Sequence, residues 1–478
     1  MTTMERAMTG AGANGGADGT RGRGAGDARE SAATSAARRA RLLVPSVVAA
    51  MVLLSSASFV IFPLIPALQG SLGVSTAEVG YLAAAGFAAA LVAELLVAPA
   101  ADRGHARLMA VIGVLMVAGS LGLSAAAAEG WQLIAGRAVG GFGFGIFVIA
   151  ASALIVRHDH RRSGELLGRL GAAELAGIAV GPLGSGLALS FAGPSAILAV
   201  SAVVVLVALV PVLVGFREAT ASGTRGGARG GHGHPRTGDC DATRGATDGT
   251  EPIGDDPHPP TGGIAAGVLG FDGTDADRSL RFGSSAPRTS LDLLRSPRIV
   301  GIVLLYAAVM VPTGAYDGVW PRFMADIGAD PVLTALSYAL FAVPYVLVAG
   351  WAGRLADRRG GVSAYARGML ILLPIVTLYG FVANPFIATG MGFVESTGQA
   401  LAFIGAAAAM AHAVDPARAG SAQGLLRGIG LAAATVAAAV SGLAYELGGA
   451  LLLFGGTAVA VAAIAAVGLL LARTRRAR

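Results

Sequence analysis

The stretch LLVPSVVAAMVLLSSASFVIFPLIPA, residues 42–67, contains no charged side chain. About 20 consecutive apolar residues are enough for a helix to cross the roughly 30 Å hydrocarbon core of a bilayer. Four further segments are equally free of charge: Leu108–Ala128, Ser195–Phe216, Val332–Gly353 and Gly448–Ala472. Their apolar runs are continuous and do not alternate, which indicates membrane-spanning helices and not the strands of a barrel.

The composition of the whole chain agrees with this interpretation. Of the 478 residues, 54% are hydrophobic and 13% are charged, and the mean hydropathy is +0.67. Soluble domains carry roughly a quarter charged residues. Seven more apolar segments carry only one or two charges each, near Val79, Trp131, Leu166, Ile299, Ala364, Pro385 and Gly420. The sequence therefore predicts an all-α membrane protein with twelve spans.

The pattern of spans occurs twice along the chain. Leu42 opens the first span and Pro297 the seventh, 255 positions later, and the pairs Asp102-Arg103 and Asp357-Arg358 are separated by the same distance. A duplicated six-helix unit is typical of a transporter whose two halves rock around a binding site between them. We expect a tail at 1–41, a first bundle at 42–216, a cytoplasmic linker at 217–296, a second bundle at 297–472 and a short tail at 473–478.

The basic residues indicate the orientation. The chain contains no lysine, and with the exception of Arg322 the arginines that flank spans fall on one set of alternate loops. By the positive-inside rule, both termini lie in the cytoplasm of a cell-membrane protein. The arginines on this cytoplasmic set of loops are Arg38, Arg39, Arg41, Arg103, Arg107, Arg157, Arg161, Arg162, Arg354, Arg358, Arg359, Arg418, Arg473, Arg475, Arg476 and Arg478.

The missing residue types exclude several functions. Without lysine there is no Walker-type phosphate loop and no lysine Schiff base, so we expect neither an ATP-driven motor nor an enzyme. Cys240 is the only cysteine. The linker and tail are rich in Gly, Pro and charged residues, which predicts disorder. His232, His234 and His258 are irregularly spaced there, so we expect no metal site and no cofactor.

A loop motif resembles a known family. Residues 353–360, Gly-Arg-Leu-Ala-Asp-Arg-Arg-Gly, match the G-x-L-x-D-R-x-G signature of the major facilitator superfamily, carried by Gly353, Asp357, Arg358 and Gly360. The first half keeps Asp102 and Arg103 of this motif. The resemblance implies a two-bundle fold whose loop charges latch the halves on the cytoplasmic side. Asp159 could bridge to Arg103 or Arg107 in the same latch.

The fifth span resembles the antiporter signature of drug:proton exporters in that superfamily. It carries Gly168, Gly177, Gly181, Pro182 and Gly186, with Ser185 in place of one glycine. Gly177, Gly181 and Gly184 share a helix face, where we expect a neighbouring helix to approach closely. The second half has no counterpart, because Val436-Ala437 stand at the repeat position of Gly181-Pro182.

In the fourth span, Leu133, Arg137 and Gly141 resemble the family's L-x-x-x-R-x-x-x-G signature. At a rise of 1.5 Å per residue, Arg137 lies roughly 9 Å into the membrane from the outer side. A charge at this depth is costly unless it has a partner or lies in a water-filled cavity. The resemblance implies a role in proton transfer. A structural ion pair or a snorkelling side chain is the alternative.

Three carboxylates inside spans are candidates for carrying protons or binding substrate. Glu395 is our first choice, and it opens a polar run that ends at Gln399. The position of the first half that corresponds to Glu395 in the repeat is Gly140, one helical turn from Arg137. We therefore expect Glu395 and Arg137 to line a central cavity from opposite halves. Glu174 is our second choice. For Glu94, a role in helix packing is as consistent with the sequence as a role in transport.

The seventh span presents Met310, Thr313, Tyr316, Asp317 and Trp320 at helical spacing. The resemblance places this span along the transport pathway, which favours contact with substrate. Tyr and Trp near a membrane boundary are also common interfacial anchors, so both interpretations stay open. Asp317 could pair with Arg322 at an outer gate.

The resemblance implies proton-coupled export of small amphipathic compounds, of the multidrug or antibiotic-resistance type, by alternating access. The expected partners are a small-molecule substrate, protons and the lipid bilayer, with no nucleic acid, and the transporter is expected to act as a monomer. A major facilitator carrier for a sugar or organic acid is the first alternative. A membrane sensor or scaffold that transports nothing is the second.

Overall fold

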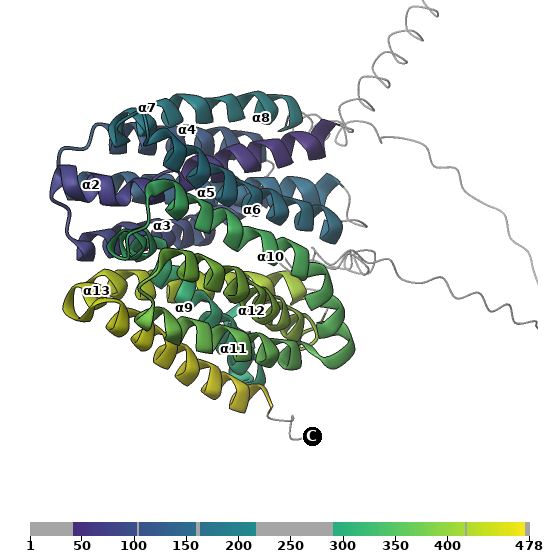
Figure 1. The fold of residues 1–478 in the computed structure, drawn as a ribbon. Helices are drawn as coiled ribbons and strands as arrows, with labels where there is room; N and C mark the ends of the chain where they lie inside the picture. The colour runs from purple at the N-terminus through teal and green to yellow at the C-terminus, as the bar shows by residue number, and fades with distance from the viewer. Residues whose placement is uncertain (1–41, 103–104, 159–162, 217–289, 416–417, 474–478) are drawn as a thin grey trace, which may run out of the picture.

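The computed structural model describes residues 42–102, 105–158, 163–216, 290–415 and 418–473. Within these ranges the chain is helical and contains no strand. Ten of the described helices are long and apolar enough to cross a membrane. The helices lie side by side in two groups (Figure 1), and α2 (Ile65–Leu72) lies at one end of the first group.

The first group begins with a helix over residues 42–59. Pro63 interrupts it, because proline lacks an N–H and its ring clashes with the preceding turn. The chain resumes in η1 (Phe62–Leu64) and α2, and Gly73, at φ +66°, ends α2 in a left-handed conformation that glycine adopts readily. The remaining elements are α3 (Thr76–Asp102), α4 (Ala106–Ala125), α5 (Gly130–His158), α6 (Ser163–Ala188), α7 (Pro194–Val205), η2 (Leu206–Ala208) and α8 (Leu209–Gly215).

The second group repeats this order from Pro297, as the duplication predicts. Asp330 and Asn384 cap the helices that follow them by accepting hydrogen bonds from backbone N–H groups. The elements are η5 (Ser290–Arg295), α9 (Pro297–Asp326), α10 (Pro331–Arg359), α11 (Gly361–Leu378), η6 (Tyr379–Phe381), α12 (Pro385–Ala411) and α13 (Ala419–Ala472).

Two helices explain the difference between ten candidate spans and the twelve predicted. The last candidate, Ser421–Ala472, contains non-helical backbone at Gly448 and Gly449, so two helical segments meet there. Helix α12 is 27 residues long, but the polar residues between Glu395 and Gln399 lower its hydropathy. The count of twelve membrane crossings stays a prediction.

The predicted linker extends too far toward the second bundle. Residues 217–296 were assigned to it, but Ser290–Arg295 form η5, and Leu293 is buried in the core of the second group. Leu293 and Leu294 pack in or against this core, which favours helical structure here despite the polar sequence before it.

Among the described residues, the backbones of the two halves come into close contact at one end. A Cβ on Gly442 of α13 would collide with the backbone oxygen of Thr76 in α3, and one on Gly80 would lie 2.7 Å from the oxygen of Ala438. Further along the same helices, a Cβ on Gly428 would meet only a Leu91 methyl group at 3.7 Å. Helices α3 and α13 therefore diverge from the contact end, defined by Thr76 and Gly442, toward an open end near Gly428.

A second pair of helices closes the contact end. Gly186 of α6 faces α10, where its Cβ would lie 2.7 Å from the oxygen of Pro331. In helix α9, a Cβ on Gly318 would lie 2.8 Å from the oxygen of Val79 in α3. Because backbone meets backbone at these positions, the contact end is sealed by tight helix packing.

Candidate functional site

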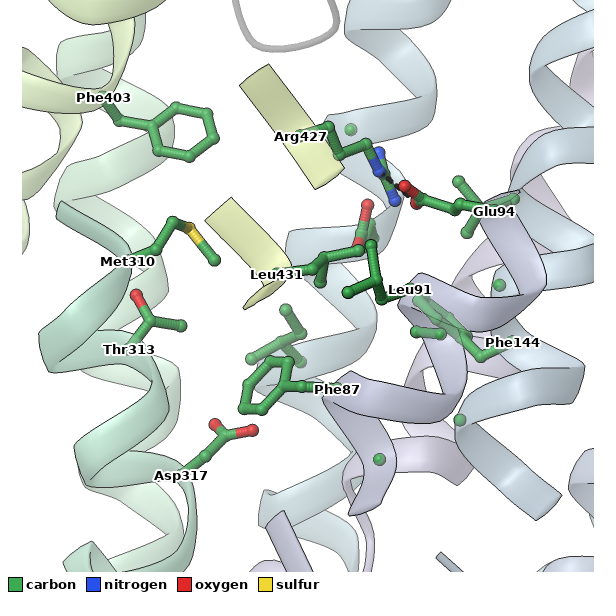
Figure 2. A pocket seen from close by; sticks show the side chains of 18 of the residues that line it. Phe87, Leu91, Glu94, Phe144, Met310, Thr313, Asp317, Phe403, Arg427 and Leu431 are labelled. Carbon is green, nitrogen blue, oxygen red and sulfur yellow. Dashed lines mark hydrogen bonds and ion pairs between the residues drawn. The ribbon is translucent and has the colours of Figure 1, made fainter. Parts of the chain in front are cut away.

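A cavity of about 1580 Å³ lies between the two halves. Helices α3, α5 and α6 line it from the first half, and α9, α10, α12 and α13 line it from the second. It extends from Trp320, near the contact end, to Leu291 and Gln423 at the open end. Figure 2 shows Met310, Thr313 and Asp317 along one face of α9, across the cavity from Phe87 and Leu91 of α3.

Glu395 lines this cavity from α12 and is only 1% exposed. Its Oε2 accepts a hydrogen bond of 2.8 Å from the hydroxyl of Tyr379, while its Oε1 has no hydrogen-bond partner among the described residues. Trp320 packs edge-on against Tyr379, with ring centroids 5.2 Å apart. One turn further along α12, the Gln399 amide donates to the Thr313 hydroxyl at 3.0 Å.

Arg137 lines the cavity from α5, opposite the helix that carries Glu395. Its Nη1 donates to the backbone oxygen of Ser58 at 2.7 Å, and its guanidinium lies 4.9 Å from the ring centroid of Phe62. Asp317 of α9 interacts with it electrostatically from the other half. Arg137 is thus anchored within the first half and attracted to a carboxylate of the second.

The predicted pairing of Asp317 with Arg322 is wrong. Arg322 forms an ion pair with Asp326 instead, at 3.0 Å, and Tyr445 donates a hydrogen bond to the same carboxylate. Residues five apart lie about 140° apart around a helix, whereas residues four apart share a face. Asp317 therefore faces the cavity while Arg322 does not.

Glu94 of α3 forms an ion pair with Arg427 of α13, at 2.5 Å, which joins the two halves (Figure 2). Glu174 of α6 lies within electrostatic range of both side chains, and all three line the cavity. Arg427 was not among the predicted site residues. Its charge in an apolar helix was a usable signal, but a partner 333 positions away was not visible in the sequence.

The aromatic residues of α9 lie inside the protein. Trp320 is 8% exposed and its indole N–H donates to the Ser337 hydroxyl at 2.9 Å. Tyr316 packs against Phe454, with ring centroids 5.4 Å apart. Both residues line the cavity, and their contact with substrate stays a prediction.

The small residues of α6 serve two different contacts. Gly177 and Gly181 face Ser55 and Ser56 of the first helix, so closely that an added Cβ would collide with them. A Cβ on Gly184 would meet nothing within 4 Å, so the expected close approach of a neighbouring helix is found at Gly177 and Gly181 but not at Gly184. Gly186 contacts α10, Pro182 lies within α6, and Gly168 is buried there.

The loop motif of the second half lies at the end of α10. Gly353 is buried, Asp357 and Arg358 occupy the last turn, and Gly360 adopts φ +84° at the junction with α11. Glycine is the residue that tolerates this backbone conformation. Asp102 ends α3, whereas Arg103 and Asp159 lie outside the described residues, so the predicted latch is only partly described.

Among the residues that the structure describes, no group of three or more His, Cys, Asp or Glu side chains is placed to hold a metal ion. His232, His234, His258 and Cys240 lie outside the described residues.

Comparison with known proteins gives one family and several similar folds. The model of the Major Facilitator Superfamily matches residues 47–311. A bacterial homologue of the human lysosomal transporter Spinster, inward-facing and unoccupied, is similar with a TM-score of 0.61 and 16% identity, over 91% of this chain and 97% of that one. No curated protein matches in sequence.

Two other solved structures share the fold. The nucleoside transporter NupG aligns with a TM-score of 0.62 and 12% identity, over 91% of this chain and 100% of that one. The human organic anion transporter MFSD10 aligns with a TM-score of 0.56 and 17% identity, over 90% and 99%. At these identities the likeness concerns the fold alone.

Proposed function

Because this chain belongs to the Major Facilitator Superfamily, a family of transporters, we propose that it exports small amphipathic compounds in exchange for protons. The observation that carries the proposal is the cavity between the halves, closed at the contact end and accessible from the open end. A site between two related bundles can face either side of a membrane in turn when the bundles rock.

The lining of the cavity supports an amphipathic substrate. Apolar and aromatic side chains such as Phe87, Phe144 and Phe341 make up much of it, and a few charged groups stand among them. Pockets with this composition bind ligands through apolar contact, and the sparse polar groups fix orientation.

We further propose that the chain crosses the cell membrane twelve times with both termini in the cytoplasm. The alternation of arginine-rich loops supports this orientation. The open end then faces the cytoplasm, which corresponds to the inward-facing state named for the Spinster homologue.

Protons would couple through Glu395 or Glu174, two cavity carboxylates for which no ion pair is recorded among the described residues. Protons entering from outside would neutralise the carboxylate and favour release of the substrate. Each pH unit of gradient supplies about 1.4 kcal/mol per proton, which supports roughly tenfold accumulation.

The test is uptake of lipophilic dyes and antibiotics into inverted vesicles, with and without an imposed proton gradient. We expect uptake that depends on the gradient and stops when a protonophore collapses it. Transport of a sugar or organic acid in place of the dyes would favour a metabolite carrier. A sensor would show no flux of any compound, and its signalling output would require residues 223–283. A transporter should keep its efflux when these residues are deleted.

A further inference from the structure

The N-terminus of α3 is capped partly from within the first half. Ser75 precedes the helix, and its hydroxyl accepts a hydrogen bond of 3.2 Å from the backbone N–H of Glu78. The Glu78 carboxylate accepts the backbone N–H of Ser75 at 2.7 Å in return, which makes a capping box. The first N–H groups of a helix have no partner inside it, and this box does not include that of Ala77.

Glu446 of the second half supplies the acceptor for Ala77. Its Oε1 accepts the backbone N–H of Ala77 at 2.9 Å. Glu446 lies on α13 one turn beyond Gly442, the glycine that meets the backbone of Thr76 at the contact end. The hydrogen bond therefore joins the two halves where their backbones already meet, and it requires that α3 and α13 lie together.

Glu446 occupies an unfavourable position in its own helix. Gly448 and Gly449 have non-helical backbone, so the first helical segment of α13 ends shortly after Glu446. A carboxylate is destabilising at the C-terminal end of a helix, which carries a partial negative charge, and stabilising at an N-terminal end. The charge of Glu446 is therefore compensated by α3 of the other half and not by α13. A residue that breaks a local rule and is compensated across an interface indicates a functional contact.

Tyr445 holds the end of this helical segment in place. Its hydroxyl donates a hydrogen bond of 2.8 Å to Asp326, which ends α9 in the same half. Asp326 also forms an ion pair with Arg322 at 3.0 Å. Because Tyr445 is bonded within the second half, the adjacent Glu446 contacts α3 from an anchored helix end.

The equivalent contact between α6 and α10 has no carboxylate at the corresponding position. Phe191 stands 255 positions before Glu446 and is 81% exposed. The N-terminus of α10 is capped by Asp330, which precedes it in the same half and accepts the N–H of Leu333 at 2.6 Å. The two sides of the contact end are therefore not equivalent, and the charged cap from the opposite half belongs to the side of α3 and α13.

We infer that Glu446 is a latch residue, which holds the contact end closed by capping α3 of the other half. When the halves rock apart at this end, the N–H of Ala77 loses its acceptor and Glu446 keeps its unfavourable place in α13. Both effects favour the closed contact end, and thus the state in which the cavity is open at its other end. The inference rests on the proposed rocking of the halves, but it holds for any substrate and any coupling ion.

Cysteine labelling measures the latch in the full-length protein in nanodiscs, where a membrane-impermeant thiol reagent reaches both faces. Cys240 is replaced by serine, and one reporter is placed at Ala77 of the contact end or at Ser421, which lines the cavity near its open end. We expect Glu446→Ala to speed labelling of Ala77→Cys about threefold, because the loss of a surface helix cap shifts an equilibrium by this amount. Labelling of Ser421→Cys should become slower, because opening of one end closes the other.

The charge and the hydrogen bond can be separated. Glu446→Gln keeps an oxygen that accepts the N–H of Ala77 but removes the charge, so its labelling rates should lie between those of the unchanged protein and Glu446→Ala. Raising the salt from about 0.05 M to about 1 M should bring the unchanged protein closer to Glu446→Gln, because salt screens exposed charges. A side chain that acts by packing alone would show no such salt dependence.

Glu78→Ala is the matched control, because it removes a carboxylate from the same helix end but from within the first half. It weakens α3 whether the contact end is open or closed, so labelling of Ser421→Cys should stay unchanged. Faster labelling of Ala77→Cys in Glu446→Ala with an unchanged rate at Ser421→Cys would show local fraying of α3 and would overturn the latch.

Gly442→Ala separates failure of the latch from failure of the proposed rocking. Labelling rates that respond to Gly442→Ala but not to Glu446→Ala would overturn the latch and leave the rocking intact. Rates at both reporters that respond to neither variant would reject the rocking itself, and the latch with it.

Discussion

Glu94 and Arg427 are 15% and 32% exposed at their side chains, so their ion pair is partly shielded from water. Removing one partner of such a pair leaves the other charge without compensation, whereas removing both is milder. We expect Arg427→Met to lower the free energy of unfolding by about 1–3 kcal/mol. The measurement is thermal unfolding in detergent.

The double variant Glu94→Gln with Arg427→Met is the control for this prediction. It should recover part of the lost stability, because no unpaired charge remains. A double variant as unstable as the sum of both single variants would show that the two side chains do not act as a pair.

Glu395 tests proton coupling at a single residue. Its glutamine variant keeps the shape of the side chain and can still accept the hydrogen bond from Tyr379, but it cannot exchange a proton. We expect Glu395→Gln to abolish gradient-driven efflux and to preserve exchange of substrate across vesicles without a gradient. Undiminished gradient-driven efflux in this variant would assign the proton to Glu174.

The sequence predicted which charged residues line the cavity better than it predicted their partners. Glu395, Glu174, Arg137 and Asp317 were identifiable because a charge in an apolar span is costly. Which carboxylate meets which guanidinium depends on how helices from different halves pack. For this reason the Arg427–Glu94 pair was missed and Asp317 was paired with the wrong arginine.

At the scale of elements, α3 and α13 form a contact that a single methyl group should disrupt. A Cβ on Gly442 would collide with the backbone of Thr76, which has no flexible end that can move aside. We expect Gly442→Ala to prevent full closure of the contact end and to shift the protein toward the opposite state. Transport should fall by about tenfold or more, since a shift of 1.4 kcal/mol changes a population tenfold.

The shift can be measured with a cysteine introduced at Ala77, in a background where Cys240 is replaced by serine. Labelling by a membrane-impermeant thiol reagent should be faster in Gly442→Ala. Gly424→Ala on the same helix is the control, because a Cβ there meets nothing within 4 Å. Equal labelling rates in all three proteins would contradict the closing role of this contact.

Element boundaries were predictable where local chemistry determines them. Helix α9 begins at Pro297 as the repeat predicts, and proline suits the first turn of a helix because its missing N–H needs no partner there. The η5 segment was not predicted, because its burial depends on a core that folds elsewhere in the chain. Whether a neighbouring helix reaches Gly184 also depends on tertiary packing, since its spacing matches that of Gly177 and Gly181.

At the scale of the whole molecule, the twelve-span arrangement predicts the side of every loop. Eight spans separate the N-terminal tail from the turn after Asp357, so both should lie on the cytoplasmic side, while the turn before Pro331 should lie outside. Single cysteines at Ser35, Ser363 and Ala329, again without Cys240, report these positions. In intact cells a membrane-impermeant reagent should label only Ala329→Cys, and in inverted vesicles only the other two. Labelling of Ser35→Cys and Ser363→Cys from opposite sides would require an odd number of crossings between them, and two parallel repeats of six spans could not then form.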